Sequence, residues 1–368
     1  MKIIETGTTY KIYGEDLVVL DNLPAQTYRV GFGQFTGFFL EKQHKLEVKE
    51  DKVYGVHNQK VDKVLKRFAD SRKNLGVILS GDKGIGKSLF ARLLANKAVD
   101  NGIPVILVDR FIPGIPDFLN GIKNEVMVLF DEFDKTFSKN GDDDPQAKML
   151  SLFDGTSDGK KLFVVTCNDY YRLNEFMVNR PGRFHFHFRF DYPNSDEVKE
   201  YLTDKLDEKF HSEIKKVVSF SRKRKLNYDC LSAIAVEINE GELFEEAIKD
   251  LNIINTRDAG NRYDVKLYTE DGIVLTRENE YIDLLSGDNF DELMYDSNDD
   301  GILLTFKKNC AAFDSKTGTF VITRDNFKTK IDEDYIDNDR LDKFKKFKFS
   351  CVRIIPVNNG GIHYNLAI

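Results

Sequence analysis

The sequence lacks any run of about 20 uninterrupted apolar residues, the length that a membrane-spanning helix needs. Its first residues, MKIIETGTTYKIYGED, have neither the basic stretch nor the apolar stretch of a secretion signal. These two absences predict a protein that is neither embedded in a membrane nor secreted. We therefore expect a cytoplasmic location.

Cysteine is scarce, with four residues that lie far apart at Cys167, Cys230, Cys310 and Cys351. None of the intervals has the paired spacing of a zinc site or of a disulfide framework. We expect reduced thiols without a catalytic or metal-binding task.

Histidine is also scarce, and the only close pair among the six is His185 and His187. In the alternating run FHFHFRF, the period of two places both side chains on one face of a strand. Two ligands without further candidates nearby do not make a metal site.

An excess of positive charge is absent too, because the net charge is −7 and the pI is about 5.6. A large sequence-independent grip on nucleic acid relies on Lys and Arg to neutralise phosphates, so this balance argues against one. A local basic groove stays open as an alternative. Hydrophobic residues make up 41% of 368, enough for more than one packed unit.

Changes of texture along the chain predict four domains. Residues 1–55 have short alternating runs and predict a small β-rich unit. Residues 56–193 alternate apolar strands with helical segments, which predicts an α/β fold with a parallel sheet covered on both faces. Residues 194–254 predict a small helical domain. Residues 255–368 have short apolar runs cut by turn residues and predict a second β-rich domain.

Two local patterns support these assignments. Apolar residues at 61, 64, 65 and 68 form a helical stripe, and GVILS, IPVILVD, EVMVLF and KLFVVTC read as buried strands. Ser195 precedes acidic residues at the start of the helical part, which predicts a helix with Ser195 as its cap.

A phosphate-binding loop is predicted between the first of these strands and the helix after it. The segment GDKGIGKS fits G-x-x-x-x-G-K-[ST] at every fixed position. Glycines let the backbone wrap an anion, Lys87 supplies positive charge to phosphates, and the Ser88 hydroxyl can bind Mg²⁺. A plain glycine turn is the alternative. The predicted contacts are Gly81, Asp82, Lys83, Gly84, Ile85, Gly86, Lys87, Ser88 and Leu89.

Carboxylates follow a second strand. VMVLF delivers Asp131 and Glu132 to the edge of the sheet where ligands of open α/β folds bind. Asp131 could hold Mg²⁺ and Glu132 could orient or deprotonate a water molecule, although a helix cap is the alternative for both. Asn168 follows KLFVVTC, where its amide could hold a phosphate or the water, or could simply start a turn.

The motifs GDKGIGKS, LFDEFD, VVTCND and NRPGRF together resemble the AAA+ ATPases, and the last resembles the second region of homology of the AAA subgroup proper. The resemblance implies ATP and Mg²⁺ as cofactors, ATP hydrolysis, and a homo-oligomeric ring of about six subunits. It implies that Arg180 and Arg183 reach the neighbour's γ-phosphate, the alternative being ordinary surface cations.

The same resemblance suggests further details. It places Tyr54 and Gly55 near adenine, and it leaves the usual arginine of the helical lid unmatched near Asp229 and Cys230. Either the lid contributes little charge, as in the AAA subgroup proper, or the basic run SRKRK at 221–225 substitutes. The overall sequence pattern is similar to that of ATPases encoded by tailed bacteriophages. If this chain is encoded by a phage, the expected cytoplasmic location is in the host cell.

The substrate is open at this point. Phe111, Ile112 and Gly114 stand where unfoldases of this family carry a peptide-gripping loop, with Pro113 stiffening it, so a protein client is favoured. SRKRKLNY at 221–228 and DKFKKFKF at 342–349 mix cations with aromatics, so a nucleic-acid motor or packaging accessory is the alternative. A solvated helix face and an edge strand are the plain interpretations of these two runs.

A third class, a nucleotide-gated scaffold, is disfavoured because Glu132 is present. The flanking β-rich regions hold no constellation of nucleophile and base, so we expect them to recognise the client.

Overall fold

The computed structural model divides the chain into two compact units, Met1–Tyr192 with Asn227–Asp229, and Pro193–Leu226 with Cys230–Ile368. We call them unit 1 and unit 2 and describe each by itself. None of the helices described is long and apolar enough to cross a membrane. The structure describes residues 1–48, 50, 52, 54, 57–139, 141, 143–154, 159–178, 180–253, 261–296, 301–314, 316–331 and 338–357.

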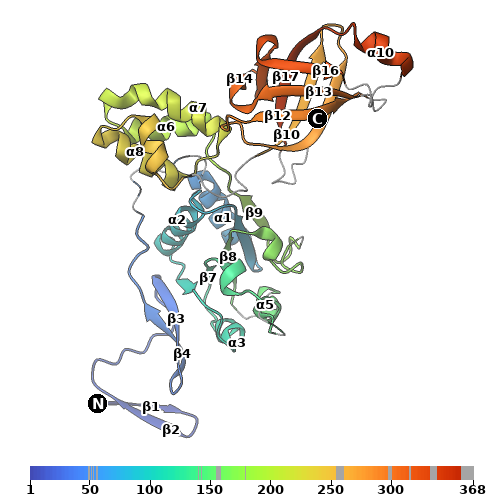
Figure 1. Cartoon of the computed structure of the whole chain (residues 1–368). Helices are drawn as coiled ribbons and strands as arrows, with labels where there is room; N and C mark the ends of the chain where they lie inside the picture. Colours follow the sequence, from blue (N-terminus) through green and yellow to red (C-terminus); the bar gives the residue numbers. More distant parts are fainter. Residues whose placement is uncertain are drawn as a thin grey trace. The chain divides into compact units, whose positions relative to one another are not determined.

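A seven-stranded sheet forms the centre of unit 1, in the order β4-β3-β6-β7-β8-β5-β9. Figure 1 labels β3, β4, β7, β8 and β9 of this sheet. All neighbours pair in parallel except β4, which is antiparallel to β3. The carboxyl ends of the parallel strands therefore meet at one edge of the sheet. The strands are β3 (Thr27–Gly33), β4 (Gly37–Lys42), β5 (Leu75–Ser80), β6 (Val105–Val108), β7 (Val126–Phe130), β8 (Lys161–Cys167) and β9 (Phe186–Arg189).

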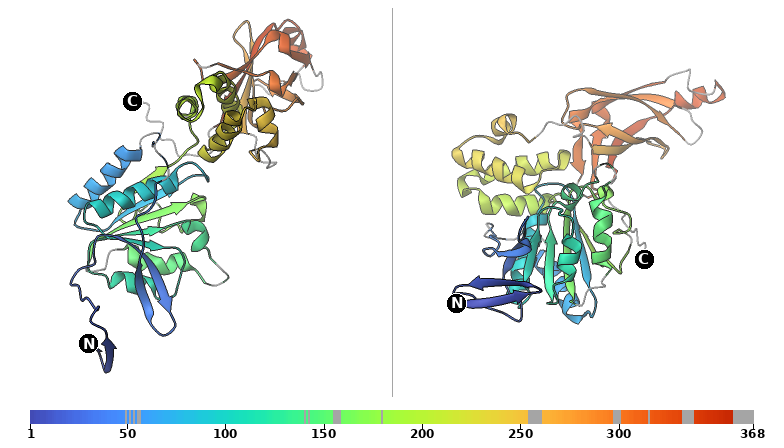
Figure 2. Two further views of the ribbon diagram at one scale, coloured as in Figure 1. Left: turned by 90° about the vertical axis from the view of Figure 1, so that its left-hand side faces the viewer. Right: turned by 90° about the horizontal axis from the view of Figure 1, so that it is seen from below.

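Helices cover both faces of this sheet (Figure 2). The predicted stripe of α1 (His57–Asp70) is confirmed, because Val61, Val64, Leu65 and Phe68 are buried and pack with α2 and one face of the sheet. The opposite face is covered by apolar residues of the next three helices, including Phe133 and Phe153. The other helices are α2 (Lys87–Asp100), α3 (Ile115–Asn120), α4 (Phe133–Thr136) and α5 (Pro145–Phe153).

The N-terminal region differs from the separate unit that its sequence suggests. Strands β1 (Lys2–Thr6) and β2 (Thr9–Tyr13) do form a two-stranded sheet of their own. Strand β3, however, is hydrogen-bonded to β6 in the main sheet, with Tyr28 and Val30 buried. Short alternating runs show that a segment is a strand but not which strand it joins.

Unit 2 contains the predicted helical segment. Its first helix is capped by Asn194, not by Ser195, because the Asn194 side chain accepts hydrogen bonds from the backbone N–H groups of Asp196 and Glu197. In return, the Glu197 carboxylate accepts a hydrogen bond from the Asn194 N–H. This reciprocal capping box stabilises the start of the helix. The helices are α6 (Ser195–Lys205), α7 (Ile214–Lys223), α8 (Tyr228–Glu240), whose first two residues belong to unit 1, and α9 (Phe244–Asp250).

The predicted second β-rich region is an eight-stranded antiparallel sheet in the order β14-β15-β17-β10-β11-β12-β13-β16. Alternate residues such as Val265, Leu267 and Ile354 are completely buried in one core. The elements are β10 (Asn261–Thr269), β11 (Val274–Ile282), β12 (Asn289–Tyr295), β13 (Gly301–Lys307), β14 (Ala312–Asp314), β15 (Thr319–Thr323), β16 (Phe327–Ile331), α10 (Asn338–Phe344) and β17 (Phe349–Pro356).

Candidate active site

The glycine-rich loop connects β5 to α2 at the carboxyl edge of the sheet. Gly81, Gly84 and Gly86 have φ angles of 142°, 72° and 95°, a region that side chains with a Cβ rarely adopt. The loop then enters α2 directly, so unpaired backbone N–H groups and the positive end of the helix dipole lie together. This is the geometry that binds an anion.

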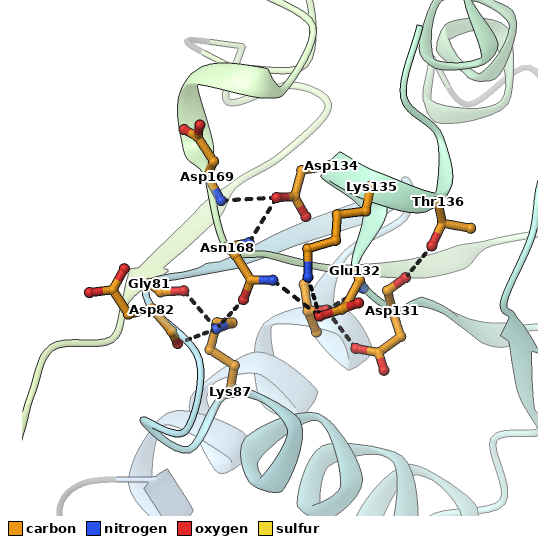
Figure 3. Close-up of polar contacts among 11 residues, drawn as sticks. Gly81, Asp82, Lys87, Asp131, Glu132, Asp134, Lys135, Thr136, Asn168 and Asp169 are labelled. Atoms are coloured by element: carbon orange, nitrogen blue, oxygen red, sulfur yellow. Dashed lines mark hydrogen bonds and ion pairs between the residues drawn. The ribbon is translucent and has the colours of Figure 1, made fainter. Parts of the chain in front are cut away.

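Lys87 points into this loop (Figure 3). Its Nζ donates to the carbonyl oxygens of Gly81 at 2.6 Å and Asp82 at 2.5 Å, and to Asn168 Oδ1 at 2.9 Å. Burial lowers the pKa of this ammonium, and nearby negative groups oppose that effect. A cation held by neutral oxygens in this way can turn to the oxygens of a bound phosphate.

The two carboxylates after β7 are held by a threonine of the neighbouring strand. Thr166 Oγ1 donates to Asp131 Oδ1 at 2.6 Å and accepts from the Glu132 N–H at 2.8 Å. Glu132 has φ 46° and ψ 47°, the left-handed region, which costs a residue with a side chain about 1–2 kcal/mol. Strain of this kind clusters at functional sites.

Glu132 is joined to the phosphate loop through Asn168, as Figure 3 shows. The Asn168 amide donates to Glu132 Oε1 at 3.1 Å while its oxygen accepts from Lys87. Lys135 also donates to Glu132 Oε1, at 2.7 Å. The hydrogen bond from Lys135 and then that from Asn168 lower the pKa of Glu132, so this carboxylate stays ionised at neutral pH.

Ser88 and Asp131 are the residues that could hold a metal ion. Both are exposed, Ser88 in the first turn of α2 and Asp131 directly after β7, and a hydroxyl with a carboxylate is the hard oxygen set that Mg²⁺ prefers. The described part of the chain has no group of three or more His, Cys, Asp or Glu residues arranged around a metal. One hydroxyl and one carboxylate fit an ion such as Mg²⁺, which commonly takes its other ligands from phosphate and water.

The two arginines of the NRPGRF motif have different surroundings. Arg183 is buried, pairs with Asp154 through two nitrogens, and donates to the Phe176 carbonyl at 2.7 Å. Arg180 is exposed at the turn that the Arg183 N–H closes. In this arrangement only Arg180 has a guanidinium that can reach outward.

A short segment from the start of α8 lies on the phosphate loop within unit 1. Asn227 Nδ2 donates to the Lys83 carbonyl at 3.1 Å, and the Tyr228 N–H donates to the Gly84 carbonyl at 2.9 Å. A Cβ at Gly84 would lie 2.6 Å from Asp229 Oδ2 and 2.7 Å from Asn227 Nδ2, so those two side chains would have to move, and the φ of 72° favours glycine as well.

Tyr54, predicted near the base of the nucleotide, is buried with its ring centroid 6.0 Å from that of Tyr228. The other residue of that prediction, Gly55, lies outside the described residues.

The suspected peptide loop is only partly exposed. Phe111 and Ile112 are partly buried and pack against the core that includes Phe133 and Phe153, and the Phe111 ring lies 5.9 Å from that of Phe137. The hairpin of β3 and β4 has exposed aromatics instead: Phe35 is 98% exposed in its turn, and Phe32 and Phe39 are 48% and 44% exposed. Phe38 of the same hairpin stacks on Phe118 of α3, with centroids 5.1 Å apart.

The basic run of residues 221–225 does not form a free cationic face. The Arg222 guanidinium lies 4.8 Å from the centre of the Phe313 ring, Lys223 Nζ donates to the Asn309 carbonyl, and buried Arg224 forms an ion pair at 3.6 Å with an aspartate of the C-terminal sheet, Asp283.

The second mixed run, 342–349, turns its aromatics inward. Phe344 and Phe349 belong to the core of the C-terminal sheet, and Phe347 packs against it. Phe349 begins β17, which lies between β15 and β10, so the expectation of an edge strand is wrong as well. These aromatic rings are not available for stacking on bases.

The sequence patterns did not predict three residues of the site: Asp134, Lys135 and Thr166. Asp134 and Lys135 directly follow the predicted carboxylates, and a third acid in LFDEFD was the available signal. Thr166 lies inside a buried strand, where its hydroxyl gives no periodic signal.

Comparison with known proteins identifies part of the chain. A search of curated proteins finds no match. Residues 77–192, from β5 to just past β9 and less than half of the chain, match the model of the ATPase family associated with various cellular activities (AAA). This part of the chain is therefore similar to the AAA ATPase domain, and its phosphate loop has the geometry that such a nucleotide-binding domain uses.

Proposed function

We propose that this protein is a ring-forming AAA+ motor that hydrolyses ATP and remodels protein clients. The observation that carries the proposal is the Asn168 amide, which bridges Lys87 of the phosphate loop and Glu132. One residue thereby senses both the γ-phosphate position and the carboxylate that handles water.

The residues divide the chemistry among them. The loop N–H groups and Lys87 bind the phosphates, and Ser88 with Asp131 would hold Mg²⁺, which neutralises charge on the β- and γ-phosphates when bound. Glu132 orients the attacking water and accepts its proton. Phosphoryl transfer requires positioning and charge stabilisation more than covalent help, and this set supplies both.

We place the remaining charge in the neighbouring subunit. Arg180 is exposed, and in this proposal it reaches the γ-phosphate of an adjacent site, as an arginine supplied in trans. Arg183 is the residue that anchors the turn through Asp154 and reaches across only if that ion pair opens. The ring, of about six subunits, rests on the AAA match.

Mixing two inactive variants tests shared sites. Glu132→Gln keeps the arginine but loses its own water-handling carboxylate, and Arg180→Ala keeps the carboxylate but loses the arginine. We expect each alone to lose about 100-fold or more in kcat, and the mixture to regain measurable turnover. Arg172→Ala, another exposed arginine, is the control. Absence of rescue at every mixing ratio, with intact assembly, would contradict a shared site.

The client proposal rests on what the basic runs do. Arg222 and Arg224 pack within unit 2, and the aromatics of 342–349 lie in a core. This removes the support for a strand-tracking groove, whereas the exposed aromatics of the β3–β4 hairpin, Phe32, Phe35 and Phe39, favour an apolar peptide.

Purified protein distinguishes the two substrates. We expect an unfolded polypeptide such as reduced casein to stimulate ATP turnover at least twofold, and single-stranded DNA or RNA to leave it unchanged. A nucleic-acid motor predicts the reverse, with stimulation that falls steeply as salt rises. The Glu132→Gln variant in ATP should retain the polypeptide on a sizing column.

A further inference from the structure

Asp134 is a buried carboxylate next to the site, and the proposed ATP hydrolysis gives it no role. Its side chain is 2% exposed, in the first turn of α4. Its Oδ2 accepts from the backbone N–H of Asn168 at 3.2 Å and of Asp169 at 3.0 Å (Figure 3). Its Oδ1 is buried and has no hydrogen-bond partner among the described residues.

Burying a carboxylate with one oxygen unsatisfied is costly, and a well-packed apolar side chain would avoid that cost. Packing alone therefore does not account for an acid at this position. What the acid provides is an acceptor for two successive N–H groups, which fixes the backbone of the turn after β8.

That turn carries the Asn168 amide, whose two ends have different partners. The oxygen accepts from Lys87 and the nitrogen donates to Glu132, so a small rotation of the backbone would break one of the two contacts. The contacts of Asn168 with Lys87 and Glu132 tie its orientation to the phosphate loop at one end and to the strained residue after β7 at the other.

We propose that Asp134 is a positioning residue: by holding the N–H groups of Asn168 and Asp169, it keeps the Asn168 amide directed at Lys87 and Glu132 together. This inference rests on the proposed ATP hydrolysis. Asp134 contacts no reacting atom and acts through Asn168.

Three variants in the full-length chain test it. Asp134→Ala removes the acceptor, Asp134→Asn keeps an oxygen for the two N–H groups, and Asp117→Asn alters an exposed first-turn acid of α3 as a control. We expect Asp134→Ala to lower kcat by about 10–100-fold while ATP binding changes less than about threefold, because misplacement affects the transition state. The kcat of Asp134→Asn should stay within about threefold of that of wild type, because the remaining oxygen still accepts from the two N–H groups and keeps Asn168 in place.

A double-mutant cycle shows whether the effect passes through Asn168. In an Asn168→Ala background, adding Asp134→Ala should cost no further kcat, because the group it positions is gone. Additive losses would overturn the proposal, and so would an Asp134→Asn variant as inactive as the alanine. If wild type itself fails to hydrolyse ATP, the proposed function is what fails.

Folding is handled separately. Should Asp134→Ala not fold, Asp134→Val, an apolar side chain closer in size to aspartate and without an acceptor, takes its place. Amide hydrogen exchange on wild type needs no variant at all: the N–H groups of Asn168 and Asp169 should be protected. Exchange as fast as that of an exposed loop would overturn the inference.

Discussion

At the scale of single residues, the backbone of Glu132 is strained. A left-handed conformation with a side chain is retained here because the N–H bond to Thr166 and the contacts of the carboxylate leave no alternative. Stability and activity are therefore opposed at this residue.

Two variants that both lose the carboxylate isolate this strain. We expect Glu132→Gly to exceed Glu132→Ala in free energy of unfolding by about 1 kcal/mol, because glycine adopts the left-handed region without a Cβ penalty. Denaturant unfolding measures the difference. A more stable alanine variant would show that residue 132 does not have this conformation in solution.

Lys135 sets the acid limit of activity. Its hydrogen bond lowers the pKa of Glu132, and Glu132 must be ionised to accept a proton from water. In Lys135→Ala that pKa rises, so the acid limb of the kcat/KM profile should move to higher pH. The exposed Lys139 replaced by alanine is the control, and an unmoved limb in Lys135→Ala would exclude the contact.

His57 makes stability depend on pH. Burial, and then the charge of Lys60, lower the pKa of His57 to about 4, against about 6.5 in the unfolded chain. As pH falls from 7 towards 4 the unfolded state takes up the proton first, so stability is lost over that interval.

His57→Phe removes this titration and keeps an aromatic ring on Phe190, whose centroid lies 5.3 Å from that of His57. We expect the fall in melting temperature between pH 7 and pH 5 to be smaller in this variant than in wild type. Exposed His185→Phe should leave the fall unchanged. Equal falls in all three proteins would place the imidazole of His57 in water.

At the scale of elements, the sequence predicted the parallel layer well and its edges poorly. Buried runs such as residues 76–80 and 161–167 identify inner strands because both of their faces are covered. The meeting of Glu132 and Asn168 followed, since carboxyl ends of parallel strands share one edge.

What could not be predicted depends on contacts distant in sequence. The pairing of Arg183 with Asp154 is set by how α5 packs, and nothing in NRPGRF specifies it. Likewise, β3 joins β6 across more than seventy intervening residues, a choice that alternation alone does not encode. The predicted helix cap was wrong by one residue, because Asn194 and Ser195 are both good caps.

At the scale of the whole molecule, helices α6 to α9 share a unit with the C-terminal sheet. The basic run contacts residues of the C-terminal β-rich region through Arg222, Lys223 and Arg224. The run that was expected on a solvated helix face therefore forms an internal joint, which connects the helices to that region within unit 2. The C-terminal sheet, which is proposed to recognise clients, is thereby attached to the helices of its own unit.

Asp283 tests this joint. Asp283→Ala removes the contact between Asp283 and the buried Arg224 guanidinium, and we expect the free energy of unfolding of unit 2 to fall by about 1–3 kcal/mol. Exposed Asp271, in the turn between β10 and β11, replaced by alanine is the matched control. If both variants unfold alike in denaturant, the ion pair contributes nothing to the joint.

The left-handed residue after β7 also has a consequence for laboratory evolution. A screen that rewards only heat resistance would enrich glycine at position 132, and a library scored by turnover would discard those clones. Selecting by both criteria in alternate rounds would keep Glu132 and direct improvement to positions far from the carboxyl edge of the sheet.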